Sequence, residues 1–179
     1  MTPTDSMPTT DQVTPTGRET PTGRERVETD ALARALEIEI VERPQADSLE
    51  AAAALLGLEP SDVIKSLVVK RHDGDYLFAL VPGDRQISWS KLRALLGVNK
   101  LSLPSADLAL GATGYERGTI TPFGSLTPLP VFADERMLGK RVALGAGSHG
   151  LSLLTDANPL LAAFDATVAD ITDPLKPRA

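Results

Sequence analysis

Apolar residues recur along this chain with two different spacings, and these spacings predict a mixture of strands and helices. Alternation, or a short apolar run between turn residues, predicts strands at 38–44, 63–71, 76–82, 129–134, 141–147 and 151–154. Helical spacing with capping residues at the ends predicts helices at 29–36, 47–57, 88–97, 105–110 and 156–164. An Asp-Gly turn within 72–75 joins two of these strands as a hairpin, which favours antiparallel or mixed strand pairing over a repeated parallel crossover.

The first 28 residues lack this pattern. They are rich in Thr, Pro and charged residues and nearly free of aliphatic ones, so they cannot bury enough apolar surface to offset chain entropy. The hexapeptide TPTGRE occurs twice in tandem there, at 14–19 and 20–25, which predicts a flexible tail and not a solenoid. We therefore expect a disordered N-terminal tail at 1–28, one mixed α/β domain at 29–172 and a C-terminal tail at 173–179.

The composition excludes several classes of protein. No run of 18 apolar residues is present and the N-terminus does not resemble a secretory signal, so we expect a cytoplasmic protein without a membrane partner. The absence of cysteine excludes disulfides, thiolate nucleophiles and cysteine-ligated zinc. The chain contains two histidines, His72 and His149, so a multi-histidine metal site is not expected, and we predict no metal and no cofactor.

The net charge of −6 argues against a generic nucleic-acid binder. The charge is unevenly distributed, because residues 64–117 carry 8 basic and 5 acidic groups and are net positive. This imbalance fits either local scatter on a solvated surface or a protein that contacts only a small part of a nucleic acid.

Lys65 interrupts an apolar strand. Residues 63, 65, 67 and 69 share one face of a strand, so Lys65 lies among apolar neighbours, and the opposite face is hardly more polar. One interpretation is a lysine near the end of a strand whose ammonium reaches water. Another is a cation at the floor of a pocket, held for an anionic or carbonyl group of a substrate. A third, Schiff-base chemistry, also fits a lysine in apolar surroundings.

A glycine-rich region follows, since residues 111–150 contain 8 of the 14 glycines. Within the stretch GYERGTITPFGS, at 114–125, the glycines permit sharp bends or a close approach to the backbone, and Pro122 stiffens one turn. The stretch is either a surface loop or a platform of backbone N–H and C=O groups for a ligand. A second segment, GAGSHG at 145–150, lacks the lysine and spacing of a Walker loop, and its adjacent Ser148 and His149 are not placed to form a catalytic pair.

Three stretches together resemble the YbaK/EbsC family, the aminoacyl-tRNA deacylases that edit mischarged tRNA and that also occur as an insertion domain in bacterial prolyl-tRNA synthetases. These stretches are SDVIKSLVVKRHDGDYLFALVPGDRQIS, then GYERGTITPFGS, then LPVFAD followed by AGSHG. The segment GTITP fits the family's loop of a glycine, three residues and a proline. The resemblance covers about residues 30–172 and implies a single barrel-like α/β domain with a mixed sheet, surrounding helices and a cleft.

The resemblance also implies roles for particular residues. Lys65 is expected to bind the phosphate or the terminal adenosine of the tRNA acceptor end, and the Gly118 backbone to lie against the ester carbonyl or to position a water. The same resemblance suggests substrate contacts at Thr119, Thr121, Pro122, Phe123, Gly124, Gly147, Ser148 and His149. The expected partners are the acceptor end of a misacylated tRNA and an aminoacyl-tRNA synthetase.

The third stretch departs from the members of the family that remove cysteine. Those members carry a serine and a later aspartate where this chain has Gly145 and Ser152. The chain is closer to relatives with an AGSH segment, which act on other small residues such as Ala, Ser or Thr. We therefore expect a trans-editing hydrolase for small amino acids such as Ala, Ser, Thr or Cys. The alternative is a module that binds an acceptor end, a nucleotide or a synthetase without turnover.

Overall fold

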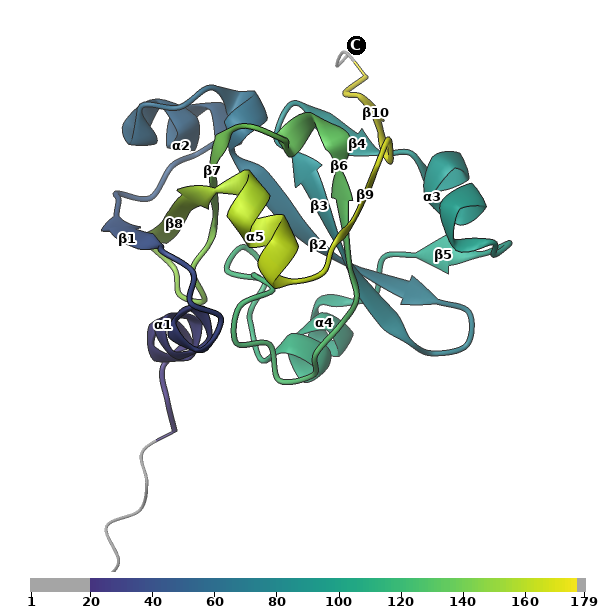
Figure 1. Cartoon of the computed structure of the whole chain (residues 1–179), viewed down its shortest axis with the longest axis horizontal. Helices are drawn as coiled ribbons and strands as arrows, with labels where there is room; N and C mark the ends of the chain where they lie inside the picture. The colour runs from purple at the N-terminus through teal and green to yellow at the C-terminus, as the bar shows by residue number, and fades with distance from the viewer. Residues whose placement is uncertain (1–19, 177–179) are drawn as a thin grey trace, which may run out of the picture.

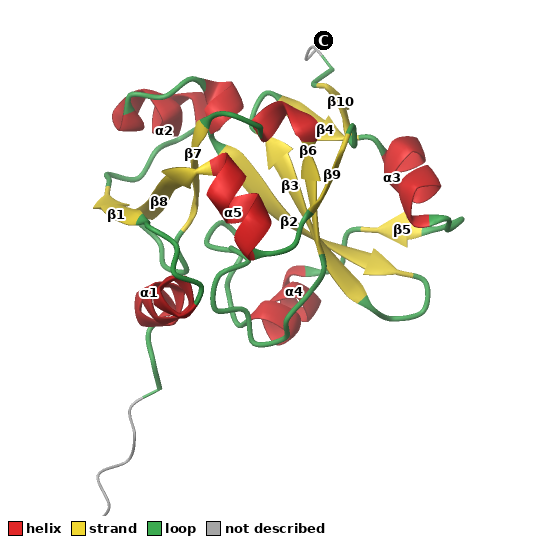
Figure 2. Ribbon diagram, viewed as in Figure 1, coloured by secondary structure: helices red, strands yellow, loops and turns green. Residues whose placement is uncertain are grey.

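A five-stranded mixed sheet forms the centre of the fold in the computed structural model, which describes residues 20–176 (Figures 1 and 2). In chain order the helices are α1 (Gly23–Ala33), α2 (Leu49–Leu56), α3 (Trp89–Leu96), α4 (Ala106–Thr113) and α5 (Ala157–Ala163), with short 3₁₀ turns η1 (Pro60–Asp62) and η2 (Glu135–Met137). The strands are β1 (Glu39–Glu42), β2 (Ile64–Arg71), β3 (Tyr76–Pro82), β4 (Arg85–Ile87), β5 (Leu101–Ser102), β6 (Val131–Asp134), β7 (Arg141–Gly145), β8 (Leu151–Asp156), β9 (Thr167–Ala169) and β10 (Thr172–Pro174).

The hairpin of β2 and β3 organises this sheet, whose strand order is β5-β2-β3-β6-β9. The two strands pair antiparallel from Lys70 opposite Tyr76 to Ile64 opposite Pro82. β5 adds antiparallel to β2, whereas β6 and β9 add in parallel on the side of β3. The predicted hairpin and the predicted mixed strand pairing are confirmed. The fold belongs to the mixed α/β class that the sequence predicts.

A second sheet of three antiparallel strands, in the order β1-β8-β7, closes against the start of β2. The contact between the two sheets includes a parallel bridge from Val63 to Ala143. β4 and β10 form a separate two-stranded ribbon. Figure 1 shows α5 between the two larger sheets and α4 below β2.

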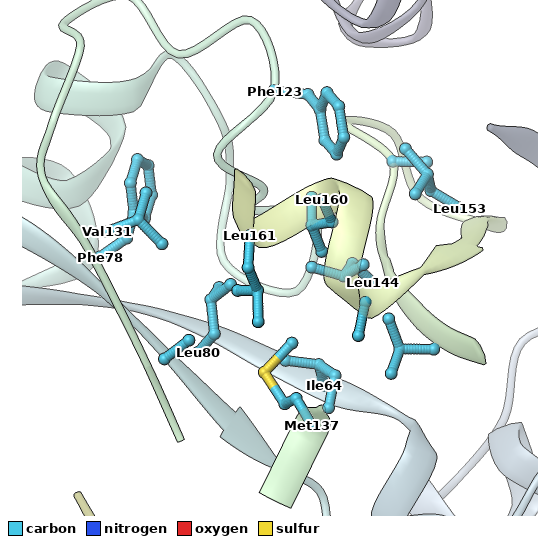
Figure 3. Close-up of a cluster of buried hydrophobic side chains, with 14 of the residues drawn as sticks. Ile64, Phe78, Leu80, Phe123, Val131, Met137, Leu144, Leu153, Leu160 and Leu161 are labelled. Carbon is cyan, nitrogen blue, oxygen red and sulfur yellow. The ribbon is translucent and has the colours of Figure 1, made fainter. Parts of the chain in front are cut away.

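Apolar residues on the two faces of β2 and β3 enter two different clusters, so the strand is covered on both sides as expected. Ile64 and Val68 belong to the larger cluster, which Figure 3 shows between the central sheet, β7, β8 and α5. Val69 belongs to the second cluster, which lies beneath α3 and β4, and Leu67 packs against that cluster. This alternation places Lys65 on the face of the second cluster and Ser66 on the face of the first.

The capping residues that the sequence indicates are largely found at the helix ends. Ser48 and Ser88 accept hydrogen bonds at the starts of α2 and α3, and both helices end at left-handed glycines. Two details differ from the predictions. α4 continues past 110 to Thr113, and Asp156 occupies the N-cap of α5 without making a side-chain capping bond.

The domain begins earlier than the sequence pattern indicates. α1 starts at Gly23 and not after Thr29, and Thr22 and Glu25 form a capping box at its start. Residues 23–28, which the sequence pattern places in the tail, are therefore helical. The helix belongs to the domain, because Val27 and Ala31 are buried in the larger cluster. The rest of the predicted tail, 1–19, lies outside the described residues.

The C-terminal boundary also moves. β10 pairs Asp173 and Pro174 with β4, so the strand includes the first two residues of the predicted C-terminal tail. Residues 177–179 lie outside the described part. Among the helices of residues 20–176, none combines the length and the apolar character that crossing a membrane requires.

Candidate active site

A cavity of about 600 Å³ opens beside β2, and its lining comes from several helices and strands and from the segments that connect them. α2, β2, α4, β7 and β8 contribute residues, the glycine-rich loop contributes residues 117, 118 and 120, and the segments after β1 and β5 contribute Arg43, Leu103 and Pro104. The charged lining residues are all cations: Arg43, Lys65 and Arg117. The cavity therefore has the size of a small-molecule site and the charge of a site for an anionic ligand.

Lys65, the second residue of β2, is among the lining residues of this cavity. Its Nζ donates a hydrogen bond to the backbone oxygen of Arg85 at the start of β4. Burial lowers the pKa of the Lys65 ammonium, and the nearby Asp84 carboxylate partly opposes that shift. An ammonium has three donors, so the bond to Arg85 leaves further donors on Lys65.

Ser66, the next residue, carries a hydroxyl that sequence reasoning missed. It also lines the cavity, and its Oγ is buried with no hydrogen-bond partner among residues 20–176. An unpaired buried hydroxyl is destabilising, so such groups often mark a place where a ligand or water binds. The only sequence signal was a serine between apolar residues of a strand, which is too common to be diagnostic.

Gly118 forms the opposite wall of the cavity. Its φ of +91° is a conformation that side-chain-bearing residues rarely adopt, and a Cβ placed there would meet only the His149 ring, at 4.0 Å. The residue is exposed, and the turn around it is closed by a backbone hydrogen bond of 3.0 Å from Thr119 to Glu116. The space in front of Gly118 is thus open, and its backbone faces the cavity.

The other predicted contacts in this loop do not line the cavity. Thr119 is buried and donates its hydroxyl to the Glu116 carbonyl, and Thr121 is buried with no partner for its Oγ1 in the described part of the chain. Pro122 is buried, and Phe123 packs edge-to-face on Phe164 with ring centroids 5.0 Å apart. Gly124 lies against α1, where an added Cβ would stand 2.7 Å from a backbone oxygen. Their assignment as substrate contacts stays a prediction.

The 145–150 turn lies beside the same loop, because the Gly147 amide donates to the Thr119 carbonyl over 3.0 Å. Gly147 packs against the start of α1 and is outside the cavity lining, and Ser148 is partly buried. His149 is exposed, and its Nε2 is 3.0 Å from a Glu116 carboxylate oxygen. Since the His149 ring is the nearest group to Gly118, it lies at the rim of the cavity.

Two arginines complete the cationic lining, and sequence reasoning missed both. Arg43 follows β1, and its guanidinium donates to the Ser152 hydroxyl over 2.9 Å, while its backbone N–H donates to the Gly150 carbonyl. Arg117 precedes Gly118 and is exposed. Both come from segments far from β2 in the sequence, so only the tertiary structure brings them to Lys65.

The lining residues include no Asp, Glu or His within the part of the chain that the structure describes. Ser66 and Ser152 supply its only side-chain hydroxyls, and no general base stands beside either in the lining. The arrangement can hold an anionic ligand with cations and present backbone groups to a reacting centre. It is poorly equipped for a nucleophile that needs activation by a neighbouring base.

Comparison with known proteins decides the family. The sequence profile of the aminoacyl-tRNA editing domain matches residues 43–163. The chain belongs to this editing-domain family. The matched range contains every lining residue of the cavity, from Arg43 to Ser152, whereas α1 precedes it.

Two relatives of this editing domain are proline–tRNA ligases. The protein from Bacillus licheniformis is 36% identical over 109 residues, which are 60% of this chain and 19% of the ligase. The protein from Bacillus pumilus is 28% identical over 137 residues, which are 76% of this chain and 24% of the ligase. The chain thus spans about a fifth to a quarter of the length of these curated relatives.

A solved structure described as a candidate trans-editing enzyme for prolyl tRNA synthetase superposes with a TM-score of 0.79 at 28% identity. The match covers 86% of this chain and 99% of that one. The editing-domain fold and the resemblance to the prolyl-tRNA synthetase editing family are therefore confirmed, and a role in aminoacyl-tRNA editing is supported.

Proposed function

We propose that this protein is a trans-acting hydrolase that cleaves the ester of a tRNA misacylated with a small amino acid, such as Ala, Ser, Thr or Cys. One observation carries the proposal: Lys65 and Gly118, which are far apart in the sequence, line the same cationic cavity. Membership of the editing-domain family and the likeness to a trans-editing candidate support it.

The cations of the cavity fit the end of an RNA chain. The acceptor end brings phosphates, a terminal nucleoside and the aminoacyl group, and a cavity of about 600 Å³ suits the last two together. Arg43 and Arg117 would hold phosphates, and the free donors of Lys65 would hold the phosphate or the terminal adenosine. A protein that grips only this end tolerates a net charge of −6.

The hydrolysis needs no strong nucleophile from the protein, because an aminoacyl ester is already activated. Water adds to the ester carbonyl carbon, the bond from that carbon to the ribose oxygen breaks, and the products are a free amino acid and a tRNA with a free terminal hydroxyl. The protein positions the water and stabilises the oxyanion, and the Gly118 backbone would lie against that carbonyl. The substrate's own ribose hydroxyl would assist the proton transfer.

A second function, binding without turnover, is favoured by one observation. Within residues 20–176, the cavity lining has no Asp, Glu or His side chain to act as a general base. On this alternative the same residues would hold an acceptor end, a nucleotide or a synthetase, and Lys65→Ala would weaken binding without any hydrolysis to abolish.

The test is a deacylation assay with tRNAs charged separately with Ala, Ser, Thr, Cys and Pro. Wild-type protein is expected to hydrolyse a subset of these esters, and Lys65→Ala is expected to lower kcat/KM by about a hundredfold. Lys70→Ala is the matched control, because Lys70 lies on the same strand and outside the cavity lining. It should retain activity within about twofold.

The opposite result is equally clear. If the wild-type protein hydrolyses none of these esters but binds an uncleavable amide-linked aminoacyl-tRNA, the binding function replaces the enzymatic one. If it does neither, both proposals fail and the fold assignment alone remains.

A further inference from the structure

Helix α1 lies against both of the glycine-containing segments beside the cavity, although it precedes the range that the family profile matches. In Figure 1 it lies beside the turn between β7 and β8. Its first residue, Gly23, touches Gly147 so closely that a Cβ on either residue would crowd the other's backbone. One turn further along the helix, the backbone of Arg26 touches Gly124 of the loop.

Arg26 joins the two ends of the glycine-rich loop. Its guanidinium donates to the backbone oxygens of Thr113 at 2.8 Å and Gly114 at 3.4 Å, where the loop begins. It also donates to the oxygen of Gly124, where the loop ends, from Nε at 3.0 Å and again from Nη2. One planar group with several donors therefore spans residues ten positions apart, which a lysine cannot do.

Asp30, one helical turn after Arg26, completes the contact. Its carboxylate accepts a hydrogen bond of 2.9 Å from the Gly124 amide. Tyr115 lies beneath the Arg26 guanidinium, 4.4 Å from its ring centroid, and donates its hydroxyl to the Phe123 carbonyl over 2.6 Å. The loop is thus fixed at both ends by groups on α1, and Gly118 lies between the fixed points.

We infer that Arg26 and Asp30 are positioning residues for the reaction at Gly118. They do not line the cavity, so they act through the loop backbone and not on substrate. This inference rests on the proposed hydrolysis, in which the Gly118 backbone must be held at the ester carbonyl. Misplacement of a reacting group by about 1 Å costs on the order of a hundredfold in rate, so fixing the ends of this loop matters for turnover.

The experiment measures kcat and KM for the best ester substrate in the full-length protein, and hydrogen exchange of the 114–124 amides in the same variants. Arg26→Met removes all of the guanidinium bonds, and Arg26→Lys keeps the charge without the fork. Both are expected to lower kcat per folded molecule by about tenfold or more, to leave KM nearly unchanged and to speed exchange in the loop, with exchange in β3 unchanged.

Two controls separate positioning from general damage. Arg24 lies on the same helix and, among residues 20–176, its ion pair is with the exposed Glu28, so Arg24→Lys and Arg24→Met should behave like wild type. Asp30→Asn keeps an oxygen that can accept from Gly124 and should retain much more activity than Asp30→Ala. Arg26→Lys also serves as the milder variant if Arg26→Met fails to fold.

The outcomes distinguish this inference from the proposed function. Active wild type with Arg26→Lys that matches it in both kcat and loop exchange overturns the positioning role and leaves the hydrolase standing. Wild type that hydrolyses no ester overturns the proposed function and this role in catalysis together, whatever the exchange of the loop. Loss of kcat in the Arg26 variants but not in the Arg24 variants supports the positioning role.

Discussion

Two glycines of one loop, Gly118 and Gly124, are both left-handed but face different surroundings. Gly118 has a φ of +91° and looks into open space in the cavity, where a Cβ would meet only the His149 ring. Gly124 has a φ of +64° and faces α1, where a Cβ would lie 2.7 Å from the Arg26 oxygen and 2.9 Å from the Tyr115 hydroxyl. The same residue type thus serves a ligand-facing surface at one position and helix packing at the other.

The difference shows that glycine content alone does not locate an active site. A glycine that packs against the protein should affect stability when it is replaced, and a glycine that faces a cavity should affect function. Each substitution needs a control glycine that has a similar φ and open surroundings. Gly97 is this control for Gly124, and Gly74 is this control for Gly118.

The largest effect on stability is expected for Gly124→Ala. The left-handed strain of about 1 kcal/mol adds to overpacking of about 2 kcal/mol against the Arg26 backbone, so the free energy of unfolding should fall by about 3 kcal/mol. Gly97→Ala is the control, since Gly97 has a φ of +66° with nothing within 4 Å, and should cost about 1 kcal/mol. Urea unfolding measures both, and equal losses would mean that α1 does not crowd Gly124.

A smaller effect on stability is expected at Tyr115, whose hydroxyl donates a hydrogen bond to the Phe123 carbonyl of the same loop. Burial raises the pKa of the Tyr115 hydroxyl to about 12, with Arg26 opposing the shift and Asp30 adding to it, so the fold favours the neutral form of the hydroxyl. Its contribution to stability is therefore complete below the ordinary pKa of 10.0 and is lost as pH rises from there to about 12.

Tyr115→Phe should lower the free energy of unfolding by about 1 kcal/mol at neutral pH, which is the net value of one hydrogen bond. It should also flatten the alkaline loss of stability between pH 10 and about 12. Unfolding titrations of wild type and variant over that range provide the measurement. A wild-type stability that is level across this range would show that the hydroxyl is not held in its neutral form.

The smallest effect is expected at the rim beside Gly118. Glu116 and His149 form a contact of 3.0 Å, but both side chains are about 70% exposed. Solvent screens such pairs, so Glu116→Gln should change the free energy of unfolding by less than about 0.5 kcal/mol. Thermal unfolding of the two proteins tests this, and a larger loss would indicate that the rim supports the loop as α1 does.

The elements defined by local chemistry were predictable from the sequence. The Asp-Gly turn predicts the β2–β3 hairpin, and the serine and glycine caps predict α2 and α3. The apolar pattern places the start of α1 too late, because Val27 is the only aliphatic residue of the helix before Thr29. The Thr22–Glu25 capping box is a local signal of the true start, whereas the contacts of Arg26 with residues 113, 114 and 124 have no local signal.

The cavity residues also divide into those that local sequence predicts and those that it does not. Lys65 and Gly118 were selected because a cation in an apolar strand and a glycine-rich loop are unusual within short windows, and both line the cavity. Arg43, Ser66 and Arg117 are ordinary residues in their windows, and only folding gathers them around one space. Conversely, Gly124 and Gly147 matched the glycine pattern, but they pack on α1.

The most direct measurement compares Gly118→Ala with Gly74→Ala in the deacylation assay. Gly74 has a φ of +90°, lies in the exposed hairpin turn and has open surroundings, so both substitutions carry the same backbone strain of about 1–2 kcal/mol. If the Gly118 backbone acts on the ester, Gly118→Ala should lower kcat/KM by about a hundredfold while Gly74→Ala stays within about twofold of wild type. Equal hydrolysis by the two variants would contradict the account, because the open glycine would then have no part in the reaction.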